Sequence, residues 1–512
     1  MGRRQEEIAL DIAYLLRRAA RMFPGTVAVD DGHVAWTAEQ LLSRGERLAN
    51  ALDALGVPQG ATVGVLSHNR SAYLEADTAI ALGRRVRVAL NARLHLEDFR
   101  YIAGDAELAA LFYSAEFEEQ ATSLREAFGL VLIALDGPGA AGAGIEDLVE
   151  QSSGEVRLRA SDPEEPAWIA YTSGTTGRPK GVVLSHRAVR EVAYNLLLEV
   201  GPVVPGERIV LTQPLSHGAG YFTLPYLLSG AGVQVQQKFD AEEVWALSRR
   251  PEIRTLKAVP AMLEPILAAE SGEWGYETIV YGASSIPAPV LDRCLDRFGP
   301  TLIQDYGQSE APMTLTCLQK TDHLDPAVRL SAGRPWKTVA VEVRDDDGFV
   351  AGPGETGELY VRGPHLMTHY RNKPEATAAV LQDGWLRTKD MAVMDDRGFV
   401  HLRGRRDEMI NSGGFNISPR EVEDVLSAHH GVDEAVVLGI PDARWGEAVT
   451  AVVRPAAGAA LTEAEVLAFA RPRLRMRTPK RVLLWTDIPR NSYGKVDRLG
   501  IKSQLEREVG CE

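Results

Sequence analysis

A loop rich in glycine and hydroxyl residues, at residues 170–186, constrains the fold of this chain more than any other segment. Glycine lets backbone N–H groups turn towards an anion, hydroxyls add donors, and a lysine supplies a compact positive charge. Ten residues carry three glycines, four hydroxyls and one amine: Gly174, Gly177, Gly181, Thr172, Ser173, Thr175, Thr176 and Lys180. The segment is predicted to hold phosphate groups; the alternative is an ordinary turn, which needs only one or two such residues.

The loop differs from the common P-loop, in which the lysine is followed by Ser or Thr and then by a helix. Here Lys180 is followed by Gly181 and the apolar run 182–184, so we expect a hairpin of two strands. Ser185 can then cap a helix whose apolar residues recur at helical spacing over residues 189–197. Both ends of the loop are therefore expected to be anchored on regular elements.

Length, composition and charge limit the class of protein. With 512 residues, the chain is too long for one hydrophobic core. The net charge of -14 argues against a nucleic-acid partner or an anionic membrane surface, because each requires a basic face. No run of 18 apolar residues is present, so no membrane span is expected. Three scattered cysteines indicate neither a disulfide framework nor a metal site, and favour a reducing, cytoplasmic location.

The order of predicted elements indicates an α/β multidomain protein. Helical patterns at 8–22, 37–55, 71–82 and from 95 alternate with strands such as 62–66, which predicts parallel sheets with right-handed crossovers. Short strands and turns from about residue 332 predict an antiparallel, barrel-like part. Past Gly404 lies a compact α+β segment with capping boxes at 418–421 and 462–465. We therefore expect a large domain at 1–403 and a small mobile domain at 404–512.

Three arginines, Arg84, Arg85 and Arg87, precede or enter one predicted strand. Buried, unpaired arginines are costly. The sequence therefore predicts a strand edge or a subunit contact, as in a homodimer, or simply a solvated face.

Six motifs occur in a family order: TSGTTGRPKG, DYGQSE, GELYVRG, GWLRTKD, GRRDEMINSGGFNISPREVE and PRNSYGKVDR. Together they resemble the adenylate-forming superfamily over nearly the full chain, which comprises acyl-CoA synthetases, peptide-synthetase adenylation domains and luciferases. The resemblance, closest to acyl-CoA ligases, implies ATP or acyl-AMP, Mg²⁺ and coenzyme A as cofactors, and a small carboxylic acid and CoA as partners. Joining two anions requires preorganised N–H donors and positive charge, which these motifs would supply.

The resemblance also implies a role for single residues. Ser309 would lie at the α-phosphate, Glu310 would hold Mg²⁺, and Lys495 would bridge the acyl carboxylate and the phosphate. Tyr306 would stack on adenine, while Asp390, aided by Arg405, would accept from the ribose hydroxyls. The remaining nucleotide residues are Thr172, Ser173, Gly174, Thr175, Thr176, Gly177, Lys180, Gly282, Ala283, Ser284, Asp305 and Gly307.

Transfer to CoA implies a rotation of the small domain about a hinge at Asp407. Gly413, Gly414 and Phe415 would then face the pantetheine arm, and His217 would gate the acyl carboxylate. The family analogy places Val259, Met262, Gly282, Ala283, Ile303, Ala311, Pro312 and Met313 near the acyl group. This set predicts an apolar acid with a ring or a bulky skeleton. Taken singly, His217 could be a turn residue, Glu310 a solvated strand end, Tyr306 a core aromatic and Lys495 a surface charge.

One departure from the family stands at residues 388–390, where Thr-Lys-Asp replaces Thr-Gly-Asp. If the backbone of Lys389 has a positive φ, a lysine there costs about 1 kcal/mol and could shift Asp390 away from the ribose. With an ordinary backbone, Lys389 would point to water. Its cation could also bind a phosphate of the nucleotide or the 3′-phosphate of CoA.

Four functions remain open on the sequence. The leading one is an acyl-CoA ligase that forms acyl-AMP and transfers the acyl group to CoA. The second is an enzyme that performs only thioesterification of supplied acyl-AMP. The third is a stand-alone adenylating enzyme that loads a carrier protein. The fourth is a nucleotide-binding protein without turnover, against which the presence of Lys180 and Lys495 counts.

Overall fold

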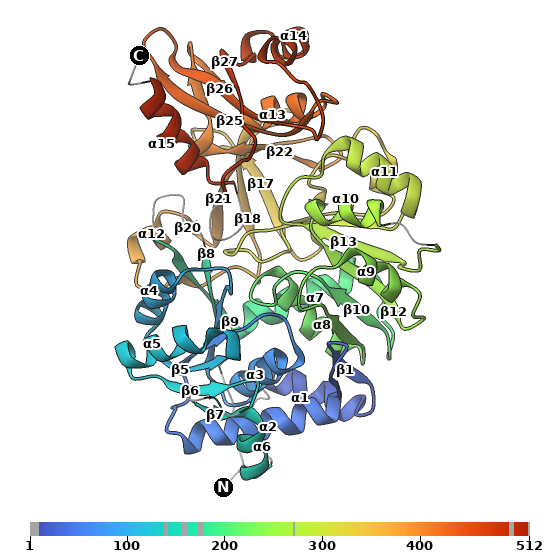
Figure 1. Ribbon diagram of the computed structural model, residues 1–512, viewed down its shortest axis with the longest axis vertical. Coiled ribbons are helices and arrows are strands. Elements are labelled where there is room, and N and C mark those ends of the chain that lie inside the picture. Colours follow the sequence, from blue (N-terminus) through green and yellow to red (C-terminus); the bar gives the residue numbers. More distant parts are fainter. Residues whose placement is uncertain are drawn as a thin grey trace.

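The computed structural model describes residues 10–137, 139, 142–154, 162–172, 178–269, 272–490 and 496–509. A large lobe carries the N-terminus at one end of the long axis, and a small lobe carries the C-terminus at the other (Figure 1). The predicted α/β multidomain class, with parallel sheets, a half-barrel and an α+β C-terminal part, is confirmed.

The first sheet of the large lobe has eight strands in the order β19-β9-β8-β4-β3-β5-β6-β7. Its core strands pair in parallel, and β8 and β9 form the predicted antiparallel hairpin around the glycine-rich loop. The strands are β3 (Thr62–Leu66), β4 (Val86–Leu90), β5 (Leu108–Tyr113), β6 (Val131–Ala134), β7 (Ala143–Gly144), β8 (Pro166–Thr172), β9 (Lys180–Ser185) and β19 (His369–Tyr370). The helices between them are α2 (Ala38–Ala54), α3 (Ser71–Leu82), α4 (Leu96–Ala106), α5 (Glu118–Phe128) and α6 (Ile145–Gln151).

The second sheet has nine strands in the order β16-β15-β14-β13-β12-β10-β11-β1-β2. Its strands are β1 (Val27–Asp30), β2 (Ala35–Thr37), β10 (Arg208–Leu211), β11 (Gly232–Val235), β12 (Ile253–Ala258), β13 (Thr278–Gly282), β14 (Leu302–Tyr306), β15 (Thr316–Leu318) and β16 (Arg334–Pro335). The other helices of the large lobe are α1 (Ile12–Met22), α7 (His186–Glu199), α8 (Thr223–Leu228), α9 (Ala241–Ser248), α10 (Pro260–Ala268) and α11 (Ala288–Phe298); of these, α7 packs on β8 and β9 of the first sheet. Ser185 caps α7, because its Oγ accepts from the backbone N of Ala188 at 3.2 Å.

The predicted antiparallel part is a sheet of β17 (Ala340–Arg344), β18 (Thr356–Arg362), β20 (Leu381–Gln382), β21 (Trp385–Met394) and β22 (Val400–Arg405), with α12 (Pro374–Ala378) beside it. The small lobe contains β23 (Ile410–Ser412), β24 (Phe415–Ile417), α13 (Pro419–Ser427), β25 (Val432–Asp442), β26 (Gly446–Pro455), α14 (Glu463–Leu474), β27 (Arg481–Leu484) and α15 (Arg498–Val509). Its two apolar clusters contain no residue before Ile410. We therefore keep the proposal of a domain boundary near Gly404.

The expectation for the arginines near residue 85 is wrong. Strand β4 lies between β8 and β3, inside the sheet, and Arg85 and Arg87 are buried. Arg87 pairs with Asp77 at 2.7 Å and lies over the ring of Trp168, while Arg85 pairs with Asp53 at 2.5 Å. The partners remove the cost that an unpaired buried charge would carry, so neither a strand edge nor a subunit contact is needed.

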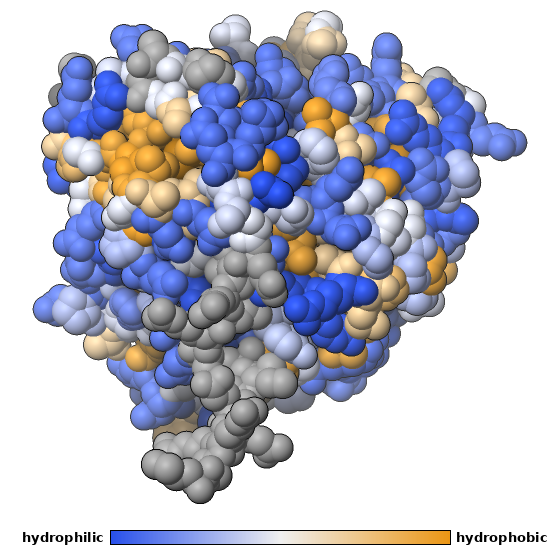
Figure 2. Space-filling view, turned by 90° about the horizontal axis from the view of Figure 1, so that it is seen from below, coloured by the Kyte–Doolittle hydropathy of each residue, from blue (hydrophilic) through white to orange (hydrophobic). Residues whose placement is uncertain are grey.

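The surface at the N-terminal end of the molecule is mostly hydrophilic; its largest group of hydrophobic residues lies at the upper left of the view, with smaller groups elsewhere (Figure 2). Among the described residues, no helix is both long enough and apolar enough to cross a membrane.

Candidate active site

A cavity of about 840 Å³ lies where the strand ends of the large lobe meet the antiparallel sheet and the small lobe. The carboxyl ends of β13 and β14 open into it, which is where open α/β sheets place ligands. Twelve of the residues singled out from the sequence line it: Thr172, Lys180, His217, Ala283, Ser284, Asp305, Tyr306, Gly307, Ser309, Glu310, Asp390 and Arg405. Segments more than 200 residues apart are thus brought to one site.

Other predicted residues do not line this cavity. The acyl-side candidates Val259, Met262, Ala311 and Pro312 are absent from its wall, and Ala311 is fully buried. The CoA-side candidates Gly413, Gly414 and Phe415, and the hinge candidate Asp407, also lie off the wall. Ser173, Gly174, Thr175, Thr176, Gly177 and Lys495 fall outside the described residues.

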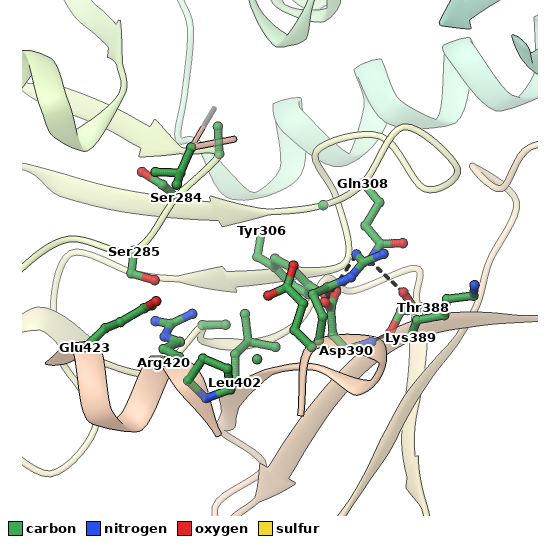
Figure 3. Close-up of a pocket in the computed structure, with 18 of the residues that line it drawn as sticks. Ser284, Ser285, Tyr306, Gln308, Thr388, Lys389, Asp390, Leu402, Arg420 and Glu423 are labelled. Atoms are coloured by element: carbon green, nitrogen blue, oxygen red, sulfur yellow. Dashed lines mark hydrogen bonds and ion pairs between the residues drawn. The ribbon is translucent and has the colours of Figure 1, made fainter. Parts of the chain in front are cut away.

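Asp390 is a cavity carboxylate that three side chains hold in place. Strand register brings Arg405 of β22 opposite it, with Nη1 at 3.3 Å from Oδ1. The hydroxyl of Tyr306 and the Nε2 of Gln308 both donate to Oδ2, the latter at 2.5 Å. The side chains of Tyr306, Gln308 and Asp390 point toward one another in Figure 3. Burial raises the pKa of Asp390, and the positive charge of Arg405 works against that shift.

Lys389 has a positive φ of 63° on the wall of this cavity. Non-glycine residues seldom adopt this left-handed conformation, so the first of the two backbone alternatives for Lys389 holds. Asp390 nevertheless keeps its place, because its backbone N donates to Thr388 Oγ1 at 3.1 Å and its carboxylate keeps its three side-chain partners. The side chain of Lys389 extends away from Asp390 and Tyr306 (Figure 3).

Glu310 is a second carboxylate on the wall of the cavity. The hydroxyl of Tyr370 donates to its Oε1 at 2.6 Å, and Lys180 lies with its Nζ 5.0 Å from the ring centre of Tyr370. Mg²⁺ is usually held by one or two carboxylates together with phosphate oxygens and water. The described residues contain no cluster of three or more ligand side chains. A single carboxylate such as Glu310 would hold Mg²⁺ only together with phosphate oxygens and water.

The segment expected to hold adenine is strained and closely packed. Ala283 has a φ of 70°, a conformation that is costly outside glycine and that gathers at functional sites. A Cβ on the adjacent Gly282 would stand 1.7 Å from Asp305 Oδ1. Glycine is therefore required at 282, because the carboxylate of Asp305 occupies the space of a side chain there.

Two buried side chains, Asn69 and Arg87, hold the turn that carries His217. Asn69 donates to the carbonyl of Gln213 at 2.8 Å and accepts from the backbone N of Leu215 at 2.8 Å. Arg87 donates to the carbonyl of Leu215 at 3.0 Å. The side chain of His217 bonds through Nδ1 to Ser216 Oγ at 2.9 Å.

The small lobe closes one side of the cavity. Arg420 and Glu423 of α13 lie opposite Ser285 of the large lobe (Figure 3). Val496 and Arg498, just after the predicted lysine loop, also line the wall. In this arrangement the C-terminal segment, rather than the glycine pair at 413–414, faces the cavity.

Near the predicted hinge, Arg406 and Glu408 form ion pairs with different lobes. Arg406 pairs with Asp346 at 2.7 Å and with Glu358 at 3.2 Å, both in the large lobe. Glu408 lies 3.7 Å from Arg498 of the small lobe. The backbone at 407 therefore separates residues anchored to different lobes.

Sequence reasoning missed three groups at the site. Gln308 and Tyr370 hold Asp390 and Glu310, and Lys257 of β12 forms a buried pair with Asp305. Gln308 lies inside the DYGQSE motif, which could have identified it. Tyr370 lies in no motif that could have identified it. For Lys257 the only sequence signal is the scarcity of lysine, which accounts for ten of the 56 basic residues.

Comparisons with known proteins point in one direction. A family model described as AMP-binding enzyme matches residues 16–371, and a model of the AMP-binding enzyme C-terminal domain matches residues 421–495. The chain is similar to the indoleacetate–CoA ligase of Aromatoleum aromaticum, with 34% identity over 511 residues that cover 98% of this chain and 100% of the relative.

Two solved structures have a similar fold over nearly the whole chain. The amide bond synthetase McbA from Marinactinospora thermotolerans superposes with a TM-score of 0.88 and 29% identity, covering 97% of this chain and 100% of its own. The o-succinylbenzoate CoA synthetase MenE from Bacillus subtilis, in complex with ATP and magnesium ion, gives a TM-score of 0.86 and 27% identity, with coverage of 96% and 99%.

Proposed function

The chain belongs to the AMP-binding enzyme family, and we propose that it is a carboxylate–CoA ligase that performs both half-reactions. In the first, a carboxylate oxygen of the acid attacks the α-phosphorus of ATP, and the bond to pyrophosphate breaks. In the second, the thiol of CoA loses its proton and attacks the acyl carbon, and AMP leaves. The observation that carries this proposal is that Asp390 stays in the cavity with Lys180 and Glu310, although Lys389 has a positive φ.

The nucleotide-binding proposal assigns separate tasks to two groups of residues on the cavity wall. Asp390 would accept from the ribose hydroxyls, since a carboxylate fixed by Tyr306, Gln308 and Arg405 is preorganised for that contact. In the other group, Lys180 would bind phosphate oxygens and Ser309 would donate to the α-phosphate. Glu310 would hold Mg²⁺, which neutralises charge on the departing pyrophosphate.

The acyl and CoA assignments follow the same division. His217 would lie beside the acyl carboxylate, on a turn that Asn69 and Arg87 hold rigid. Lys495 would bridge carboxylate and phosphate during adenylation, and a rotation at Asp407 would then bring Gly413, Gly414 and Phe415 to the cavity. The similarity to an indoleacetate–CoA ligase supports an aromatic or other bulky apolar acid. Val259, Met262, Ala311 and Pro312 stay the proposed acyl-side residues, although they lie off the wall of the described cavity.

A second candidate function is thioesterification of supplied acyl-AMP without adenylation. The positive φ of Lys389 favours it, because strain next to Asp390 could weaken the ribose contact.

One experiment with two arms separates these functions. The purified protein is given acid, ATP and Mg²⁺ with CoA in the first arm, and synthetic acyl-AMP with CoA in the second. We expect acyl-CoA in both arms at comparable rates. Product in the second arm alone would replace the proposal by the thioesterification function. Parallel reactions that offer an amine or a holo carrier protein instead of CoA identify the acceptor, and a preference for either would refute the CoA assignment.

A further inference from the structure

A buried ion pair joins Asp305, on the wall of the cavity, to Lys257, which has no task in the proposed reaction. Lys257 Nζ donates to both oxygens of Asp305, at 2.9 and 2.7 Å, and each side chain is 1% exposed. Strand β13 lies between the two strands that carry them. The ammonium group reaches across β13 because the residue opposite Asp305 is Gly282, which leaves that space open.

The pair lies on the face of the sheet that is expected to hold the acyl group. Strand register aligns Lys257 with Val280 and Val280 with Ile303, and both of these apolar residues belong to the cluster that contains Phe222 and Ala311. Lys257 Nζ is 5.2 Å from the ring centre of Phe222. Phe222 ends the short helix Gly218–Phe222, which follows His217 directly. Asp305 itself lines the cavity.

Stability does not explain such a pair. Burial lowers the pKa of Lys257 and raises that of Asp305, and the mutual attraction of the two charges opposes both shifts. Replacing a buried ion pair by apolar residues of similar volume is often neutral or stabilising, so packing alone would not require it. An ammonium group has three N–H donors, and the hydrogen bonds of Lys257 in the described structure use the oxygens of Asp305 only.

We propose that Lys257, held by Asp305, is a specificity-determining residue that donates a hydrogen bond to a neutral oxygen on the acyl group: a hydroxyl, ether or keto oxygen. This inference rests on the proposed ligase function and names the class of its acid. The pair is neutral as a whole, so it offers no net charge to balance a second carboxylate or an amino group that would have to lose its water on binding. The preferred substrates are therefore neutral, oxygen-bearing acids rather than dicarboxylic or amino acids.

The binding test does not depend on turnover. Pairs of aryl- and cycloalkyl-propanoic acids that differ only by one hydroxyl or keto oxygen are converted to acyl-sulfamoyl adenosines, and their affinities are measured by calorimetry. The variants are Lys257→Met, the double variant Lys257→Met with Asp305→Asn, and the control Lys238→Met at an exposed lysine. The double variant keeps the test valid if an unpaired Asp305 prevents Lys257→Met from folding.

We expect the wild-type protein and the control to prefer the oxygen-bearing member of each pair by about tenfold or more, because a buried charged donor left unpaired discriminates strongly. Both Lys257 variants should lose this preference, and Lys257→Met alone should bind ATP as before. Equal affinities in the wild-type protein, or a preference that survives in the double variant, would overturn the inference. Retained discrimination in binding without CoA ligation of any acid would instead refute the proposed function alone.

Discussion

Replacing Lys389 by glycine should stabilise the protein slightly and leave adenylation nearly unchanged. A left-handed backbone costs a non-glycine residue roughly 1–2 kcal/mol, and glycine avoids that cost. Glycine also has more conformational freedom in the unfolded chain, which lowers the free energy of unfolding by about 0.5–1 kcal/mol. The expected net gain in the free energy of unfolding is therefore about 0.5–1 kcal/mol, measured by urea denaturation.

The kinetic part of the prediction follows from the contacts of Asp390. Tyr306, Gln308 and Arg405 hold its carboxylate and Thr388 holds its backbone N, so no hydrogen bond of Asp390 passes through the side chain of Lys389. The rate of pyrophosphate release from acid and ATP should change by less than about threefold, or under 1 kcal/mol of barrier.

A matched control stands in the same hairpin. Asp383 is exposed and has a φ of 51°, so Asp383→Gly relieves similar strain away from the cavity. It should show the same small stabilisation and no kinetic change. The reasoning fails if Lys389→Gly, but not the control, raises the adenylation rate tenfold or more while the rate from acyl-AMP stays constant. A tenfold effect corresponds to about 1.4 kcal/mol, which would mean that Lys389 does disturb Asp390.

Three further predictions concern buried and metal-binding groups. Arg87→Met should cost roughly 3 kcal/mol by leaving Asp77 unpaired, and adding Asp77→Asn should recover much of it in a double-mutant cycle of urea unfolding. Burial lowers the pKa of His365 to about 3, so the free energy of unfolding falls by up to about 1.4 kcal/mol per pH unit as pH falls from 6.5 toward 3. His365→Leu should reduce this dependence on pH, and an unchanged slope would contradict the role of His365. Glu310→Gln should raise the Mg²⁺ concentration for half-maximal pyrophosphate release at least about tenfold, and an unaltered Mg²⁺ titration would exclude Glu310 as the ligand.

Apolar periodicity and helix caps predict several element boundaries from the sequence. The expected strand 62–66 and helix 71–82 coincide with β3 and α3, and Thr37 caps α2 through a capping box with Gln40. Apolar periodicity and caps act within a few residues, so they can be read along the chain.

Pairing between distant charges could not be read in the same way. The sequence predicts a strand edge, a subunit contact or a solvated face for the arginine cluster, because Asp53, which pairs with Arg85, is 32 residues away and becomes a neighbour only through the fold. Lys257 and Asp305 are 48 residues apart, and their contact also depends on the missing side chain of Gly282. The order of the motifs therefore predicts the residues at the strand ends. The groups that hold these residues in position become apparent only in the folded structure.

The change of anchoring between Arg406 and Glu408 also indicates where the chain could be cut and rejoined in a chimera. A junction between these residues leaves Arg406 with Asp346 and Glu358 and supplies Glu408 together with its own Arg498 from the incoming small lobe. A junction several residues later would combine a Glu408 from one parent with an α15 from another. Grafts of small lobes from relatives should therefore succeed most often when the seam lies at 407.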